Sequence, residues 1–340
     1  MKWARQRPEW LAGWLFAAPA VAGIGLFLLV PVVLAFWASF RDWNGIGPLG
    51  ESHSVGTANY EALLVSDGLP RSDFAVALRN NLYYVLGVVP LQTALAFGLA
   101  LVLNQRYPRL RGFFRAAYYF PSVTSSIAIS LIFIFLFQTN GIVNAVASGV
   151  FGAEPVNWLE NADGVLHLGL GALGLDLEQP PTWLTGTTVL GLPLWDWLSG
   201  PSVTLLSIML LAVWTTSGMF MVIFLAGLQN IPEAVEEAAV VDGAGPWRRL
   251  WSVTIPMMRP TLALVLTLGV TGTWQVFDQV YAISAGGPQR TTLTPAYLIF
   301  RDGFRNFSMG RASAIAFVLL VVIVASTLVS RWLLNRKERA

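Results

Sequence analysis

Long apolar stretches alternate with short polar segments along the whole chain. A helix rises 1.5 Å per residue, so about 20 apolar residues are needed to cross about 30 Å of hydrocarbon. Six stretches reach this length, and the pattern therefore predicts an all-α membrane protein with six transmembrane helices. We expect these helices at residues 11–40, 82–103, 116–138, 202–228, 261–283 and 312–334.

Prolines and polar segments add detail to this pattern. Pro19 and Pro31 are expected to bend the first helix, and Pro121 is expected to break the first turns of the third. The polar stretch 41–79 predicts an external loop. A further amphipathic or re-entrant helix is predicted at 294–307. Its apolar side would be formed by Tyr297, Phe300, Phe304 and Phe307.

Composition supports the membrane assignment. Of the 340 residues, 55% are hydrophobic and 12% are charged, whereas about 25% of residues are charged in soluble domains. The mean hydropathy is +0.61. The chain contains no cysteine, which excludes disulfides and thiolate metal sites.

The distribution of charge predicts the orientation in the membrane. No Lys or Arg occurs from residue 116 to 247, and the loop between the third and fourth stretches carries only acidic charge. Basic residues follow the second stretch and occupy both termini. By the positive-inside rule, this loop is external and both termini are cytoplasmic. The acidic residues are Glu154, Glu160, Asp163, Asp176, Glu178 and Asp196, and the basic ones are Arg106, Arg109, Arg111, Arg115, Arg331, Arg336, Lys337 and Arg339.

The polar segment 231–260, between the fourth and fifth stretches, predicts a helix, a turn and a second helix. Asn230 can cap the first helix, and Gly243 can turn the chain in the left-handed conformation that glycine adopts at low cost. A second helix can begin at Pro246, and Pro256 is expected to break it. We call this segment the hairpin.

Part of the hairpin carries a long motif with fixed spacing: Glu237-Ala238-Ala239, Asp242-Gly243-Ala244, then Val253, Ile255 and Pro256. It resembles the EAA loop of permease subunits in binding-protein-dependent ABC importers. The resemblance implies that the loop inserts into a cleft on a separate ATPase subunit. The residues implied in ATPase docking are Glu237, Ala238, Ala239, Asp242, Gly243 and Ala244. The alternative is an amphipathic connector that lies on the membrane surface.

Three shorter motifs extend the resemblance over residues 59–334 to the carbohydrate-uptake subfamily, which includes permeases for maltose and glycerol 3-phosphate. They are Asn59-Tyr60-Glu61, the run RGFFRAAYYFPS at 111–122, and Gly286-Gly287-Pro288. The resemblance implies the type I ABC importer permease fold in a prokaryotic inner (cytoplasmic) membrane. It also implies a second homologous permease subunit, two ATP-binding subunits and an external solute-binding protein as partners.

These features predict a domain layout. Residues 1–81 would form a first helix with its external loop, 82–334 the core permease domain, and 335–340 a cytoplasmic tail. The core would contain an external insertion at about 154–200, for which three roles are open: contact with the external receptor, a position on the membrane surface, or packing against the rest of the protein. The apolar residues of this insertion are Trp183, Leu184, Leu190, Leu192, Trp195, Trp197 and Leu198.

The sequence predicts that the chain is not itself an enzyme. A P-loop requires a lysine after its glycines to reach the phosphates of ATP, but the only lysines are Lys2 and Lys337. ATP and Mg would therefore be bound by the partner ATPase, and we expect no cofactor in this chain. The only histidines, His53 and His167, are far apart in sequence, and we predict no catalytic or metal site.

Polar uncharged side chains within the predicted helices indicate a path for a neutral, hydroxyl-rich solute. Such groups can hydrogen-bond to sugars or stack on them, but they can also join helices to one another. Asp278 is the one ionisable residue predicted inside the membrane, and it would either face the path or hold a structural hydrogen bond. The candidates for the path are Gln92, Ser126, Trp214, Ser217, Trp274, Gln275, Asp278 and Gln279, with Ser122, Ser125 and Thr215 nearby.

Two other functions are compatible with parts of the sequence. A stand-alone ion-coupled or facilitative sugar transporter would need few partners, but ion coupling requires charged groups in the membrane, and Asp278 is the single candidate. A membrane enzyme acting on lipid-linked sugars would turn over its substrate as an isolated chain. Carbohydrate import powered by a separate ATPase is the function that the sequence favours.

Overall fold

A computed structural model describes residues 3–104, 111–174 and 180–336 of the chain. The described residues fold into helices joined by turns, with two short antiparallel pairs of strands. Six of the predicted charged residues lie outside the described residues: Arg106, Arg109, Asp176, Glu178, Lys337 and Arg339.

The chain forms two compact units. Among the described residues, one unit lies within Met1–Ser66 and Ile299–Phe317, and the other lies within Asp67–Leu298 and Val318–Ala340. The grouping follows the tertiary contacts rather than the order of the sequence, because α17 (Pro295–Phe300) and α18 (Met309–Arg336) contribute to both units.

The first unit contains the N-terminal helix and the loop that follows it. Its elements are α1 (Trp3–Ile24), the π-helix η1 (Gly25–Leu29), α2 (Val30–Ala38), β1 (Arg41–Asp42), η2 (Leu49–Glu51), β2 (His53–Ser54), α3 (Ala58–Leu64) and the π-helix η4 (Arg301–Arg305). The Asn59 amide donates to the carbonyls of Ser39 and Arg41, and the Tyr60 hydroxyl donates to Ser39 Oγ. The Asn-Tyr motif therefore fastens α3 to the end of α2.

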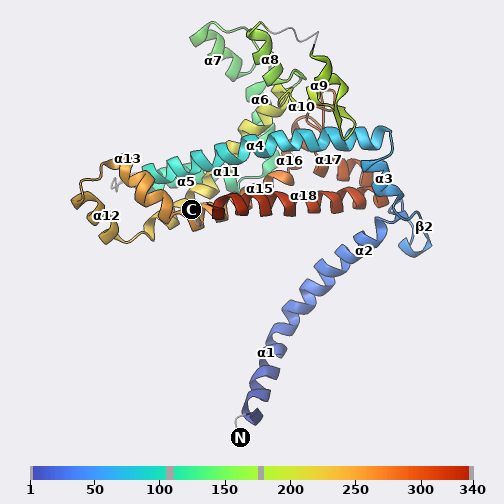
Figure 1. Ribbon diagram of the computed structural model, residues 1–340, viewed down its shortest axis with the longest axis horizontal. Coiled ribbons are helices and arrows are strands. Elements are labelled where there is room, and N and C mark those ends of the chain that lie inside the picture. Colours follow the sequence, from blue (N-terminus) through green and yellow to red (C-terminus); the bar gives the residue numbers. More distant parts are fainter. Residues whose placement is uncertain (1–2, 105–110, 175–179, 337–340) are drawn as a thin grey trace. The chain divides into compact units, whose positions relative to one another are not determined.

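The second unit contains the remaining elements (Figure 1). They are α4 (Leu69–Asn104), α5 (Arg111–Val123), α6 (Ser126–Phe137), α7 (Ile142–Phe151), α8 (Val165–Ala172), α9 (Thr182–Gly186), β3 (Thr188–Val189), β4 (Leu192–Pro193), α10 (Leu194–Trp197), α11 (Val203–Gln229), α12 (Glu233–Val241), α13 (Pro246–Arg249), the π-helix η3 (Leu250–Thr254), α14 (Ile255–Met257), α15 (Arg259–Trp274) and α16 (Asp278–Ile283).

The prediction of six membrane-crossing helices is confirmed. Six helical segments of the described residues are long and apolar enough to cross a membrane: Trp10–Ala38, Leu69–Asn104, Ser126–Phe151, Val203–Gln229, Arg259–Ile283 and Met309–Leu333. Ser202 caps α11, because its side chain accepts a hydrogen bond from the Leu205 amide. The fourth span therefore begins where the sequence predicts.

The prediction that a loop extends to residue 79 is wrong, because α4 already begins at Leu69. Pro70 is compatible with this start, since the first turn of a helix needs no amide hydrogen bond. Polar side chains in the first turns of α4 instead bind neighbouring segments. Asn80 donates to the carbonyls of Arg290 and Leu293, for example, and Arg290 forms an ion pair with Asp73.

The third predicted helix is divided at a different place from the one expected. Pro121 lies inside α5, and the break comes at Thr124 and Ser125, before α6 begins. A proline in the last turn removes only one backbone hydrogen bond. The hydroxyls of Ser122 and Thr124 bond to carbonyls of this turn, those of Tyr119 and Phe120. The helix therefore continues past the proline.

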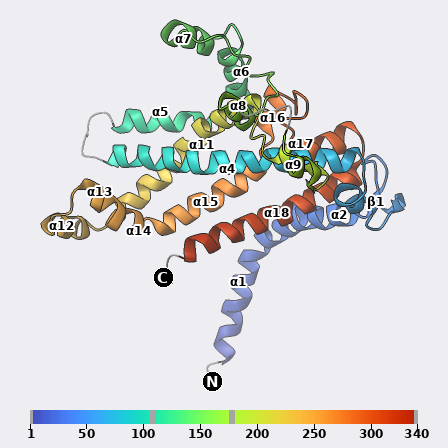
Figure 2. The ribbon, with the colours of Figure 1, turned by 45° about the horizontal axis from the view of Figure 1, so that its top comes forward.

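Glycines allow the helices of the second unit to approach closely. Helix α11 lies along α4, α5 and α15, and Figures 1 and 2 both show α4 and α11 side by side. A Cβ at Gly218 would collide with the backbone of Tyr118, and one at Gly87 would collide with Met209. Small residues serve this purpose in membrane helices, where van der Waals packing replaces the hydrophobic effect as the main attraction.

Candidate functional site

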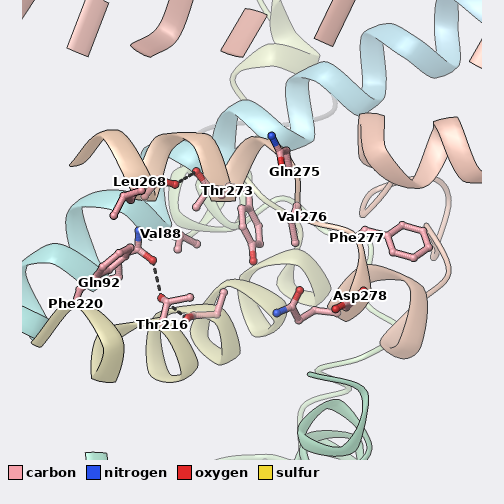
Figure 3. Close-up of a pocket in the computed structure, with 15 residues that line it drawn as sticks. Val88, Gln92, Thr216, Phe220, Leu268, Thr273, Gln275, Val276, Phe277 and Asp278 are labelled. Carbon is pink, nitrogen blue, oxygen red and sulfur yellow. Dashed lines mark hydrogen bonds between the residues drawn. The ribbon is translucent and has the colours of Figure 1, made fainter. Parts of the chain in front are cut away.

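A central cavity of about 250 Å³ lies among α4, α11, α15 and α16 (Figure 3). It combines apolar walls with hydroxyl, amide and carboxylate groups. Its lining residues are Tyr84, Val88, Gln92, Ala212, Thr216, Phe220, Leu268, Gly269, Gly272, Thr273, Gln275, Val276, Phe277, Asp278 and Gln279. Such a lining can both orient a polar solute through a few hydrogen bonds and contact its less polar faces.

Gln92 and Thr216 point toward one another across this cavity. The Thr216 hydroxyl donates to Gln92 Oε1 at 2.6 Å, joining α4 to α11. Gln92 is 1% exposed, and a buried amide without partners would be costly. Gly269 on α15 makes room for this amide, because a Cβ there would lie 2.7 Å from Gln92 Nε2.

The fifth span is interrupted beside the cavity. Helix α15 ends at Trp274, and α16 begins at Asp278, so the sequence prediction of one continuous helix at 261–283 is wrong at Gln275–Phe277. Interrupted helices occur in membrane proteins where the backbone lines a cavity rather than lipid. Asp278 is exposed and lines the cavity, and its place on a solute path stays a prediction.

A second cavity of about 200 Å³ adjoins the first. The two share Thr216, Phe220 and Gln279 in their linings. The second cavity extends toward α5 and α6, where Ser122 and Ser126 line it, and Thr215 lines it from α11. The Ser126 hydroxyl is buried without a hydrogen-bond partner in the described part of the protein.

The structure brings together five of the eight residues predicted for the path. Gln92, Gln275, Asp278 and Gln279 line the central cavity, and Ser126 lines the second. The other three, Trp214, Ser217 and Trp274, line neither cavity. Neighbouring residues on a helix point in directions about 100° apart, so residues next to a lining residue need not face the same cavity. Trp214 is 53% exposed on α11. Ser217 is buried and donates to the Val213 carbonyl, and Trp274 is 3% exposed.

Sequence reasoning missed three polar residues of the central cavity: Tyr84, Thr216 and Thr273. Tyr84 lies two helical turns before Gln92, and Thr216 lies between two residues that were selected. A four-residue spacing from Gln92 along α4 would have found Tyr84 and Val88. Nothing local in the sequence shows that Thr216 faces Gln92, because 124 residues separate them.

The hairpin has the predicted helix, turn and second helix. Helix α12 ends at Val241, and Gly243 adopts φ +74°, a left-handed conformation that favours glycine. The amide of Gly243 bonds to the Val240 carbonyl, and that of Ala244 bonds to the Ala239 carbonyl. Helix α13 then begins at Pro246. The turn is therefore held by local backbone hydrogen bonds.

Two details of the predicted hairpin are wrong. Asn230 does not cap α12: it ends α11, and α12 begins after Pro232 without a side-chain cap. Pro256 does not break the second helix, because η3 and α14 continue it to Met257. The π-helical hydrogen bonds of η3 reach back five residues rather than four, and this wider winding accommodates the proline.

The surface of the hairpin is open. None of the described residues of α12 and α13 is buried. Large apolar side chains are exposed there: Val241 at 86%, Trp247 at 74% and Trp251 at 64%. Of the residues predicted to dock, four are exposed and two are half-buried. The exposed four are Glu237, Ala238, Asp242 and Gly243, and the half-buried two are Ala239 and Ala244.

A groove of about 390 Å³ lies between the hairpin and the end of α4. Glu236 and Arg249 line it from the hairpin, and Leu101 lines it from α4. Ile231 and Leu103 belong to the buried cluster that joins α4, α11 and α15. The hairpin is thus attached to the helical body at its base, while its turn is free of such packing.

Comparison with known proteins is consistent with this arrangement. Residues 92–339 match the family described as "Binding-protein-dependent transport system inner membrane component". The chain is 30% identical to the lactose transport system permease protein LacF of Rhizobium radiobacter, over 92% of this chain and 91% of that protein. It is 29% identical to the arabinooligosaccharides transport system permease protein AraP of Bacillus subtilis (strain 168), over 94% and 87%.

Solved structures share the fold. A bacterial ABC transporter involved in the import of the acidic polysaccharide alginate has a chain that matches with a TM-score of 0.71 at 19% identity, and 98% of each chain is covered. The alginate transporter bound to a periplasmic protein carrying an alginate pentasaccharide gives a TM-score of 0.72 at 20% identity, covering 98% of this chain and 97% of that one. With six apolar helices, an interrupted fifth span and a match over residues 92–339, the chain is a multi-pass membrane protein that belongs to the inner membrane components of binding-protein-dependent transport systems.

Proposed function

We propose that this chain is a permease subunit that carries a sugar or oligosaccharide into the cell, driven by ATP hydrolysis in a separate ATPase subunit docked on the hairpin. Its partners would be a second homologous permease, two ATP-binding subunits and an external solute-binding protein. The ATPase subunits would bind ATP and Mg. The observation that carries the proposal is the open hairpin at one end of a helical body that holds a cavity with apolar walls and a few polar groups.

The exposed residues of the hairpin support ATPase docking. Exposed apolar patches usually mark a surface that contacts another protein or a membrane. The charged hairpin exposes Val241, Trp247 and Trp251. The small residues beside Gly243 allow close approach of another backbone, and Glu237 offers a carboxylate to a basic partner. A rigid turn with exposed apolar and acidic groups is suited to a cleft on another protein.

The lining of the central cavity supports a neutral solute. Amide and hydroxyl groups of Gln92, Thr216 and Gln275 can exchange hydrogen bonds with sugar hydroxyls. The single carboxylate there, Asp278, can accept such bonds. The relatives named for lactose and arabinooligosaccharides point to the same class of solute.

The distribution of charge supports an orientation with the hairpin and both termini in the cytoplasm. The hairpin contains Arg248, Arg249 and Arg259, whereas Glu154 and Glu160 lie toward the opposite end of α11. In the proposed cycle, ATP binding closes the ATPase pair and moves the hairpin. The helical bundle then switches the cavity from facing inward to facing outward.

Purification tests the proposed assembly. We expect an ATPase to co-purify when the chain is expressed with its genomic neighbours, and uptake of a labelled sugar in proteoliposomes to require ATP. Uptake without ATP would favour a stand-alone transporter, and turnover of a lipid-linked sugar by the isolated chain would favour a membrane enzyme.

The substitution Glu237→Trp tests the docking surface. We expect ATPase co-purification and coupled ATP hydrolysis to fall together, because a bulky indole would replace an exposed carboxylate at the proposed contact. Glu154→Trp, at an exposed position far from the hairpin, is the matched control. Normal complex yield and transport in Glu237→Trp would argue against docking at this surface.

Labelling tests the orientation. The chain contains no cysteine, so Arg248→Cys introduces a single thiol at an exposed position. A membrane-impermeant maleimide should label it only after the membrane is opened, whereas Glu154→Cys should be labelled in intact cells. Labelling of Arg248→Cys from outside would place the hairpin on the wrong side for an ATPase.

A further inference from the structure

A polar pocket of about 430 Å³ lies at the end of α4 that is far from the hairpin. Three segments surround it: the first turns of α4, the insertion that contains α8 and α10, and the turn before α17. We call it the vestibule pocket. Its lining residues are Val76, Arg79, Asn80, Ala162, Asp163, Gly164, His167, Leu192, Trp195, Asp196, Ser199, Gly200, Ser202, Gln289, Arg290 and Thr291.

The walls of the vestibule pocket are held together by specific contacts. The Arg79 guanidinium donates to the Asp196 carbonyl at 3.2 Å, and the Tyr83 hydroxyl donates to the Trp197 carbonyl at 2.8 Å. Asn80 binds the turn before α17 through the carbonyl of Arg290, at 2.9 Å. The insertion and the turn are therefore both fixed to the same two turns of α4, and the pocket between them is a built feature of the fold.

The charges around the vestibule pocket are balanced. Arg79 and Arg290 contribute two positive charges, and Asp163 and Asp196 contribute two negative ones. Arg290 is also paired with Asp73 at 2.7 Å. The lining residues themselves therefore carry no excess of either sign, and they offer both hydrogen-bond donors and acceptors. This combination suits an uncharged solute with many hydroxyl groups.

Two further features point to a sugar. His167 stacks on Trp195 with ring centroids 4.3 Å apart and an angle of 24° between the planes, which places aromatic surface in the wall. Arg79 Nε and His167 Nε2 are buried without a hydrogen-bond partner in the described part of the protein. Buried polar atoms of this kind are rare unless a water or a ligand satisfies them.

The vestibule pocket and the central cavity are both lined by residues of α4. Val76 and Asn80 line the first, and Tyr84, Val88 and Gln92 line the second, so the lining positions recur every four residues. At 1.5 Å per residue, Asn80 and Gln92 are about 18 Å apart along the helix axis. Each residue also advances about 100° around the axis, so Asn80 and Gln92 are turned by about 120° relative to one another, and a solute passing from the vestibule pocket to the central cavity would move around α4 as well as along it.

We propose that the vestibule pocket is an external subsite that binds a neutral sugar unit before the solute enters the central cavity. This inference rests on the proposed function, sugar import. It assigns the insertion a role in solute recognition, through Trp195, His167 and Asp163, in addition to packing.

The test uses the complete importer, purified with its partners and reconstituted into proteoliposomes, with labelled lactose and an arabinotriose as probes. Ala162→Trp fills the pocket, and Ala153→Trp adds the same side chain to an exposed position outside it. We expect Ala162→Trp to raise KM for uptake about tenfold, equivalent to about 1.4 kcal/mol of binding, with an unchanged saturating rate. Ala153→Trp should behave as the wild type.

A second, smaller substitution in the same pocket separates loss of the subsite from misfolding of Ala162→Trp. Asp163→Ala removes an exposed carboxylate from the pocket and leaves the main-chain bond between Val203 N–H and the Asp163 carbonyl. We expect its KM to rise about threefold, since a typical hydrogen bond contributes about 0.5–1.5 kcal/mol. Association of the solute-binding protein should be normal in both variants. An acidic sugar, trigalacturonate, should compete with lactose less well than unlabelled lactose does.

Each other outcome overturns a distinct part of the inference. Wild-type KM in both pocket variants, alongside normal sugar uptake, would show that the pocket binds no solute while the proposed function stands. Loss of solute-binding protein from Ala162→Trp would make the pocket a protein contact instead. Stronger competition by trigalacturonate would contradict a neutral ligand. If the wild-type importer carried neither neutral sugar, the proposed function and the subsite would both fall.

Discussion

The hairpin and the insertion are both polar interruptions between apolar helices, but they differ in how they pack against the rest of the protein. The hairpin has no buried residue in α12 or α13. The insertion buries Leu184 and Leu192, and it receives hydrogen bonds from Arg79 and Tyr83 of α4. The hairpin is thus shaped by its own backbone, and the insertion is shaped by what it contacts.

This difference shows what an unpacked polar segment can mean. A hairpin stabilised by a local turn can keep its shape while its surface stays available to another protein. An insertion fixed to α4 can form a pocket, because its side chains are held at defined positions. Four predictions test this comparison, from the largest expected effect to the smallest.

Substitution of the glycine in the hairpin turn should have the largest effect. Gly243→Val should reduce ATP-driven uptake at least about tenfold, because the left-handed conformation costs a residue with a Cβ about 1–2 kcal/mol. A Cβ at Gly243 has no neighbour within 4 Å, so the effect would come from the backbone alone. Uptake assays on the reconstituted importer measure it.

Gly245→Val is the matched control for this prediction. Gly245 has φ −66° and ψ 167°, which valine adopts readily, and a Cβ there also has no neighbour within 4 Å. Uptake should therefore stay near the wild-type level. Equal losses in both variants would mean that the shape of the turn is not what matters.

Removing buried apolar contact should loosen the insertion. Leu192 packs on Ala75 and Val76 of α4, and Leu192→Ala should destabilise this attachment by about 2 kcal/mol. Protease cleavage within the insertion should become faster. Leu173→Ala, at a position 81% exposed, should leave the rate unchanged. Resistance of Leu192→Ala to cleavage would show that the contact does not hold the insertion.

Removing a single hydrogen bond should have a smaller effect on the same attachment. Tyr83→Phe deletes the hydroxyl that donates to the Trp197 carbonyl and should cost about 1 kcal/mol. Hydrogen exchange of α10 amides should speed up by a corresponding amount. Tyr119→Phe, at a position 39% exposed on α5, serves as the control. Unchanged exchange in Tyr83→Phe would place the anchor elsewhere.

Low pH should slightly lower the stability of the folded insertion. Burial lowers the pKa of His167 below its ordinary value, so the folded state binds fewer protons than the unfolded state. The insertion therefore has its full stability above about pH 6.5, the ordinary histidine pKa. It loses stability as the pH falls toward the lower pKa that His167 has in the folded state. Protease resistance of the insertion, measured against pH, should show this decline.

His167→Gln should remove that pH dependence. His53, the other histidine, lies on the exposed strand β2 outside the insertion and is left intact as an internal control. A decline that persisted in His167→Gln would assign the acid sensitivity to other groups.

Much of the fold follows from the sequence because its causes are local. The length of an apolar stretch decides whether it can cross a membrane, and Gly243 decides where the hairpin turns. For the cavity, Gln92, Gln275, Asp278 and Gln279 could be chosen because polar groups are rare in membrane helices. The same rule selected Trp214, Ser217 and Trp274, because it does not say toward which neighbouring helix or cavity a side chain points.

The sequence by itself determined the class of the protein, the six crossings and the helix-turn-helix form of the hairpin, since hydropathy, helix length and glycine conformation act over a few residues. Only the tertiary structure decided where α4 begins, where the third and fifth spans are interrupted, and which polar side chains meet. Thr216 reaches Gln92 across 124 positions of sequence, and Arg79 reaches Asp196 across 117. Such pairs form because helices pack against one another, and packing is a property of the whole chain.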